Sequence, residues 1–102
     1  MFHANYGPAG AQGLLKEGGT SRRAAVEKGA ASLGGSVESF YYAFGHTDAY
    51  VVLDLPSHEA AASLALTVGA SGVVSVTTTV LLEPELIDAA SRLSPEYRAP
   101  GG

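Results

Sequence analysis

Apolar and polar residues alternate over the first six positions of the chain, and this alternation predicts a short β-strand. Side chains of a strand point alternately to its two sides, so Phe2, Ala4 and Tyr6 would share one side. The opposite side of the strand would carry His3 and Asn5. The strand is therefore expected to bury its apolar side and leave the other free for polar chemistry.

The next segment, residues 7–19, is rich in glycine and is expected to form a loop. A first helix is expected after it, with Thr20 or Ser21 as the N-cap and Gly34–Gly35 ending it. Apolar or small residues then recur at the spacing of a buried helical face. They are Val26, Gly29, Ala30 and Leu33.

A second helix is expected after Ser57, its predicted N-cap, and is expected to end at Gly69. Its buried face repeats the same helical spacing. The residues of this face are Ala61, Leu64, Ala65 and Val68. A short third helix is expected from Pro84 to about Leu93, followed by an irregular tail over residues 94–102.

Residues 37–44 and 49–55 are rich in β-branched and aromatic residues and predict two strands. The turn Gly45–Asp48 lies between them and predicts a β-hairpin. The β-branched run 73–82 predicts a fourth strand. Strict alternation would divide the first hairpin strand into two sets, Val37, Ser39, Tyr41 and Ala43 against Glu38, Phe40, Tyr42 and Phe44.

The expected order is thus β-α-β-β-α-β with a C-terminal helix, which is the ferredoxin-like motif of the α+β class. We expect one domain over residues 1–102, with an antiparallel sheet, the first and third strands at its centre, and the helices on one face. Only 16% of residues are charged, against about 25% in typical domains, and 46% are hydrophobic. Since the second sheet face lacks a cover, a homo-oligomer is expected, with a second copy as that cover.

Composition also excludes several function classes. Six Lys and Arg residues against ten Asp and Glu residues are too few for a basic nucleic-acid interface. The absence of Cys excludes disulfides, zinc–thiolate sites and a thiol nucleophile. No apolar run approaches the roughly 20 residues of a membrane span, and the first residues lack a signal-peptide pattern. A cytoplasmic protein is therefore expected.

Several segments together carry a family resemblance. They are Leu14–Arg23, Leu33–Gly35, Phe40–Phe44, Gly45–Val52, Asp54–Pro56, Thr77–Leu82 and Tyr97–Gly101. With these segments the chain resembles the GYD domain family of small bacterial proteins along essentially its whole length. The resemblance implies a ferredoxin-like fold of the dimeric α/β-barrel type, and implies no particular reaction. The family is named for a Gly-Tyr-Asp turn, of which Gly45 and Asp48 are present here and the Tyr is replaced.

Two Arg residues at the start of the first helix form one candidate site. Arg22 and Arg23 would oppose the helix dipole, which favours acidic residues there, and a bound anion would reverse that cost. With the hydroxyls of Thr20 and Ser21 and free backbone N–H groups, they could hold a phosphate or carboxylate. The alternative is a capped helix whose Arg residues pair with acidic residues of the same chain or of a partner subunit.

The second candidate set comprises His3, Asn5, Tyr42, Tyr50 and Asp54. These residues would meet on the bare side of the sheet, which a dimer would turn into an enclosed cavity. There His3 could act as a general base with Asp54 as its orienting carboxylate. The alternative is that His3 and Asp54 only pair across a dimer interface.

No metal or cofactor is expected, since His46 and Asp48 in the turn are too few ligands for a metal ion. The expected function is binding of a small anionic or aromatic metabolite in a cavity at the sheet and dimer interface. A cofactor-free enzyme of the dimeric-barrel type, such as a monooxygenase, isomerase or decarboxylase, is the first alternative. A structural or regulatory assembly module without a ligand is the second. In each case Tyr97 and Arg98 of the tail could dock across a partner.

Overall fold

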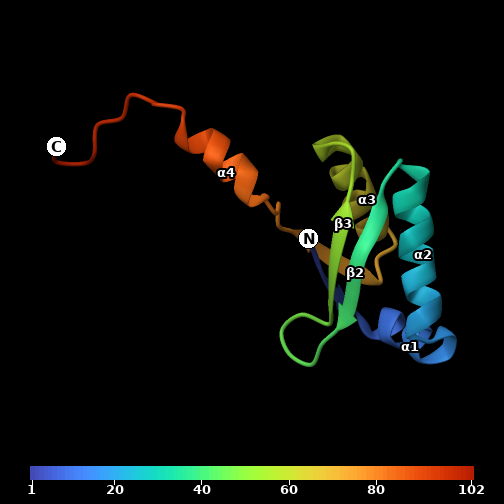
Figure 1. The fold of residues 1–102 in the computed structure, drawn as a ribbon. Helices are drawn as coiled ribbons and strands as arrows, with labels where there is room; N and C mark the ends of the chain where they lie inside the picture. The colour runs from blue at the N-terminus through green and yellow to red at the C-terminus, as the bar shows by residue number, and fades with distance from the viewer.

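A computed structural model describes all residues, 1–102, and has the α+β class predicted from the sequence (Figure 1). Four antiparallel strands and four helices follow a broadly ferredoxin-like order, with one helix more than expected. The elements are β1 (Phe2–Tyr6), α1 (Pro8–Glu17), α2 (Gly19–Ser32), β2 (Ser36–Tyr42), β3 (Ala49–Asp54), α3 (His58–Ala70), β4 (Val74–Thr78) and α4 (Pro84–Ser91). No helix has the length and apolar character that crossing a membrane requires.

The strand order is β2-β3-β1-β4, so β1 and β3 are the central pair, as predicted. Figure 1 shows α1, α2 and α3 together on one side of this sheet. The core lies between these helices and the sheet, where Phe2 and Val51 pack with Leu64 of α3. A neighbouring cluster joins three further strand residues, Ala4, Ala49 and Val74. The opposite face of the sheet has no helix over it.

Residues 8–17 form α1, so the prediction of a loop over residues 7–19 is wrong. Pro8 begins the helix at a position where a missing N–H costs nothing. Gly10 faces the carbonyl of Val73, and a Cβ at Gly10 would lie 2.3 Å from that oxygen. Glycine at this position therefore lets a helix pack against backbone, whereas the sequence pattern suggested that it belonged to a loop.

Helix ends agree with the sequence at α3 but not at the start of α2. The hydroxyl of Ser57 accepts a hydrogen bond from the Ala60 N–H at 3.1 Å, which confirms the predicted N-cap. The N-cap of α2 is Gly18, with φ of 86°, so neither Thr20 nor Ser21 has the predicted capping role. Because α1 ends directly before α2, the chain must turn sharply at this residue, which favours glycine.

Two strand details also differ from expectation. A bulge in β2 lies between Val37, which pairs with Leu53, and Ser39, which pairs with Val52. One extra residue reverses the alternation, so Val37 faces the helices, and its predicted grouping with Ser39 is wrong. Strand β4 ends at Thr78 rather than at residue 82, because its partner β1 begins at Phe2 and no strand lies beside the later residues.

The C-terminal segment extends away from the rest of the molecule. Figure 1 shows α4 and the chain end projecting beyond the sheet, far from the other helices. The radius of gyration is 17.1 Å, against about 13 Å for a compact chain of this length. The irregular tail predicted over residues 94–102 contains no helix or strand, and α4 ends at Ser91, two residues before the predicted end.

Candidate functional site

The face of the sheet opposite the helices, here called the open sheet face, draws on all four strands. Its residues alternate with the core residues along each strand. They are His3, Asn5, Ser39, Tyr41, Tyr50, Val52, Asp54, Ser75 and Thr77. This face combines aromatic, hydroxyl and imidazole groups, and the carboxylates of Asp54 and Glu38 lie toward its end.

One set of directly opposed residues crosses this face and is called the cross-strand row. Tyr41 of β2 pairs with Tyr50 of β3, Tyr50 pairs with His3 of β1, and His3 pairs with Thr77 of β4. The His3 and Tyr50 rings meet edge to face with their centroids 5.2 Å apart. A hydrogen bond of 3.2 Å joins His3 Nε2 to the hydroxyl of Thr79. Both tyrosine rings remain exposed, Tyr41 to 70%.

The structure separates Asp54 from His3. His3 lies opposite Tyr50, and Asp54 is four residues farther along β3, which corresponds to about 13 Å. The base–carboxylate pair expected from the sequence is therefore not assembled within one chain. The sequence placed both residues on one face of the sheet, and the structure agrees. The strand register, however, places them at different positions along the strand direction.

Asp54 instead lines an open cleft of about 580 Å³ at the end of the sheet. One wall of the cleft belongs to the body of the domain and includes Val52, Asp54 and His58. The facing wall comes from the segment that leaves β4 and includes Leu82 and Leu86. The cleft thus lies where the C-terminal segment departs from the sheet.

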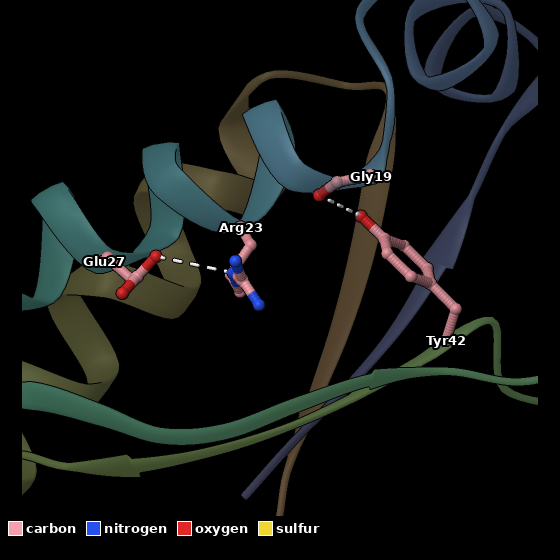
Figure 2. A network of polar contacts seen from close by, with 4 residues as sticks. All are labelled: Gly19, Arg23, Glu27 and Tyr42. Atoms are coloured by element: carbon pink, nitrogen blue, oxygen red, sulfur yellow. Dashed lines mark hydrogen bonds and ion pairs between the residues drawn. The ribbon is translucent and has the colours of Figure 1, made fainter.

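Tyr42 does not belong to the open sheet face, so its predicted grouping with Tyr50 is wrong. It pairs with Ala49, points to the helix side, and donates a hydrogen bond of 3.1 Å to the carbonyl of Gly19 (Figure 2). A Cβ at Gly19 would lie 2.8 Å from the Tyr42 ring, so the glycine permits this contact. Burial raises the pKa of Tyr42 to about 12, Tyr6 adds to this rise, and the nearby Arg residues oppose it.

The predicted anion site at the start of α2 lies on the helix side of the sheet. Arg23 Nε is 3.7 Å from Glu27 Oε1, one turn along the same helix, as Figure 2 shows. Arg22 is half-buried, while Thr20 and Ser21 are exposed. Since the sheet separates this cluster from the cross-strand row, the two candidate sets do not form one site. The Arg23–Glu27 contact matches the alternative in which an acidic residue of the same chain pairs with the Arg.

Asp48, expected to shape the turn, instead connects the turn to β1. Pairing of β1 with β3 ends at Ala4 and Ala49, and the next N–H of β1 that faces β3 belongs to Tyr6. The Asp48 carboxylate accepts that hydrogen bond at 2.9 Å. Its own N–H donates to the Ala4 carbonyl, also at 2.9 Å, and to the side-chain oxygen of Asn5 at 3.2 Å. The Gly45–Asp48 turn therefore fixes the central strand pair.

The profile of the GYD domain family matches residues 1–90. The chain belongs to the GYD domain family. All four strands and most of α4 fall within the matched part of this GYD domain, and the irregular tail lies outside it. Comparison with curated proteins and with solved structures finds no match.

Sequence reasoning missed Tyr41 as a residue of the open sheet face. The connection between β2 and β3 runs over residues 43–48, and a connection of this length does not fix the strand register as a two-residue turn would. Tyr41 and Tyr42 were therefore equivalent candidates on the aromatic pattern alone. A sequence signal was present, because alternation puts Tyr41 on the same side of the strand as the polar Ser39, and Tyr42 on the side of the apolar Phe40.

Proposed function

We propose that this GYD domain is a homo-oligomeric binding protein that takes a small aromatic or anionic metabolite on its open sheet face, in a cavity enclosed with a second copy. The observation that carries the proposal is the cross-strand row of Tyr41, Tyr50, His3 and Thr77. It places two exposed aromatic rings, an imidazole and a hydroxyl in one line across a face that no helix covers.

The chemistry of the row favours a ligand that has both a flat ring and a polar or anionic group. Exposed tyrosine rings offer a surface on which another ring can stack. The imidazole of His3 gains a positive charge when protonated and then attracts an anion. Thr77 lies directly opposite His3, and the Thr79 hydroxyl contacts the His3 ring. Both hydroxyls can donate hydrogen bonds to a carboxylate.

A second copy is part of the proposal because a sheet face alone cannot enclose a ligand. Sites for small molecules are concave and bury about 70–90% of the ligand surface. The low charge content of the chain, 16%, also suits a protein whose bare face is covered. The geometry favours binding over catalysis, since His3 and Asp54 lie about 13 Å apart along the sheet within one chain.

The proposal is tested with benzoate as the aromatic anion, acetate as the matched anion without a ring, and benzyl alcohol as the matched ring without a charge. Isothermal titration calorimetry measures each affinity, and native mass spectrometry measures the number of subunits. We expect an oligomer that binds benzoate more tightly than either matched compound. A stable monomer, or equal heats for all three compounds, would contradict the proposal.

Two substitutions locate the site. Tyr50→Leu removes the central ring of the cross-strand row, and we expect it to weaken benzoate binding about tenfold, the equivalent of one lost ring contact. Tyr42→Phe alters the tyrosine on the helix side and is the matched control, with unchanged affinity expected. Equal affinity of the Tyr50→Leu variant and the unsubstituted protein would show that the row is not the site and would favour an assembly module.

A further inference from the structure

Residues 79–102 form a C-terminal arm that leaves the domain without covering any part of it (Figure 1). Every residue of the arm is exposed. Large apolar side chains nevertheless occur along its whole length, each at least half exposed. They are Val80, Leu81, Leu82, Leu86, Ile87, Leu93 and Tyr97. Soluble monomers rarely expose so many apolar residues together, so the arm has the character of an interface.

The helix of the arm has one apolar and one charged side. Leu86 and Ala90 lie one turn apart on one side of α4, and Leu93 follows two residues after the helix ends. On the opposite side, Glu85 and Asp88 lie one turn apart, and Arg92 continues their line. An isolated helix of eight residues is not stable in water by its own propensity. Helix α4 therefore requires a surface against which its apolar side can pack.

The start of the arm is anchored at one end of the open sheet face. The Thr79 N–H donates a hydrogen bond of 2.8 Å to the Met1 carbonyl, and the Thr79 hydroxyl contacts His3 of the cross-strand row. The cleft of about 580 Å³ separates the following residues from the end of the sheet, and Leu82 and Leu86 line its outer wall. The arm thus begins beside the open face but projects away from its own body.

We propose that the arm of each copy lies across the open sheet face of a second copy and completes the binding site there. The inference rests on the proposed function, since it names what closes the site over the cross-strand row. One chain leaves this face, with its exposed Tyr41 and Tyr50 rings, and this arm, with its row of apolar side chains, without packing partners. Exchange between two copies satisfies both surfaces at once.

Size and charge support a second copy as the occupant. Helix α4 is about 12 Å long and the four strands span about 14 Å, so the helix can cross the sheet. The arm alone, residues 79–102, has 24 residues, which is within the roughly 20–30 that a stable interface presents on each side. The carboxylates near this face, Glu38 and Asp54, lie toward its end at the cleft, so an apolar helix side meets no carboxylate across the row.

The absence of Cys in the chain allows a direct cross-linking test in the full-length protein. A copy with Leu93→Cys is mixed with an isotopically labelled copy with Ser75→Cys, which places a thiol on the open face. A short bismaleimide then joins thiols that lie close together. We expect a cross-linked product containing one labelled and one unlabelled chain. Ser63→Cys, on the exposed surface of α3, is the matched control and should give none.

Two results would overturn the arm exchange. One is equal yield of mixed product with Ser75→Cys and Ser63→Cys, which indicates random collision. The other is cross-linking within single chains of a Leu93→Cys, Ser75→Cys double variant without any mixed product. That second result would mean that the arm folds back onto its own sheet.

A second pair of variants separates failure of the exchange from failure of the ligand site. Leu86→Asp places a charge on the apolar side of α4. We expect it to raise the dissociation constant of the oligomer at least about tenfold. Leu66→Asp makes the same change at an exposed position of α3 and should leave the oligomer intact. An intact oligomer that binds benzoate normally in the Leu86→Asp variant would refute the exchange while leaving the binding function standing. Mixed cross-linking without benzoate binding would do the reverse.

Discussion

The Asp48 carboxylate holds the turn of the hairpin against the central strand, and its removal is the most direct test of this structural account. Asp48 Oδ2 accepts a hydrogen bond from the Tyr6 N–H at 2.9 Å in a half-buried position. The substitution Asp48→Ala removes the acceptor and leaves the Tyr6 N–H without a partner at the end of the β1–β3 ladder. Asp48→Asn keeps an oxygen at nearly the same place and removes the charge.

Hydrogen bonds to charged groups contribute about 1.5–3 kcal/mol, and bonds between neutral groups about 0.5–1.5 kcal/mol. Because the position is only half-buried, water can reach part of the vacated space, and the lower end of the range applies. We expect Asp48→Ala to lower the free energy of unfolding by about 1.5–2 kcal/mol. For a domain of this size that corresponds to a decrease of roughly 8 °C in Tm. Asp48→Asn should lose less than about 1 kcal/mol.

Guanidinium unfolding followed by circular dichroism, at one fixed protein concentration, measures the free energy of unfolding of both variants. The fixed concentration matters because association of subunits would itself alter the apparent stability. An Asp48→Ala variant as stable as the unsubstituted protein would show that the carboxylate is not structural. If the Asn variant is destabilised as much as the Ala variant, the acceptor oxygen is not what stabilises the turn.

Three further outcomes are expected. Tyr42 should titrate near pH 12 in the absorbance at 295 nm, and Tyr42→Phe should abolish that step. Because its pKa is raised in the folded state, stability is independent of this group below pH 10 and falls between pH 10 and 12. Gly10→Ala should destabilise the protein by about 1–3 kcal/mol, since the new Cβ would meet the Val73 carbonyl, whereas Gly13→Ala has open space and should not, as thermal unfolding will reveal. Tm should also rise with protein concentration, and a constant Tm over a hundredfold range would argue against an oligomer.

The order of elements could be predicted from the sequence because local signals agree with the final fold. The Ser57 cap, the glycine at position 34 and the alternation of Phe2, Ala4 and Tyr6 each correspond to the structure. Helix α1 could not, because its glycines look like loop residues until the approach of Gly10 to the Val73 carbonyl is known. That contact joins segments more than 60 positions apart in the chain.

The candidate site could be predicted from the sequence only in part, for a similar reason. His3 and Tyr50 belong to central strands, whose alternation is regular, and their shared face follows from the sequence pattern. Tyr41 and Tyr42 belong to a strand that contains a bulge and precedes a long connection, so their faces depend on register. The separation of His3 from Asp54 also depends on register, which alternation alone leaves undetermined.

The distribution of apolar side chains connects stability to assembly in this protein. Nine of 102 residues are buried, and alanine accounts for four of the eight hydrophobic residues among them. Alanine lets α2 and α3 approach the sheet closely, but each buried methyl group contributes only about 0.8 kcal/mol. Seven of the thirteen exposed large hydrophobic residues belong to the C-terminal arm, and Tyr41 and Tyr50 lie on the open sheet face. The arm thus offers apolar surface for association beside a core built largely of small side chains, so arm exchange would stabilise the fold of each chain as well as close the site.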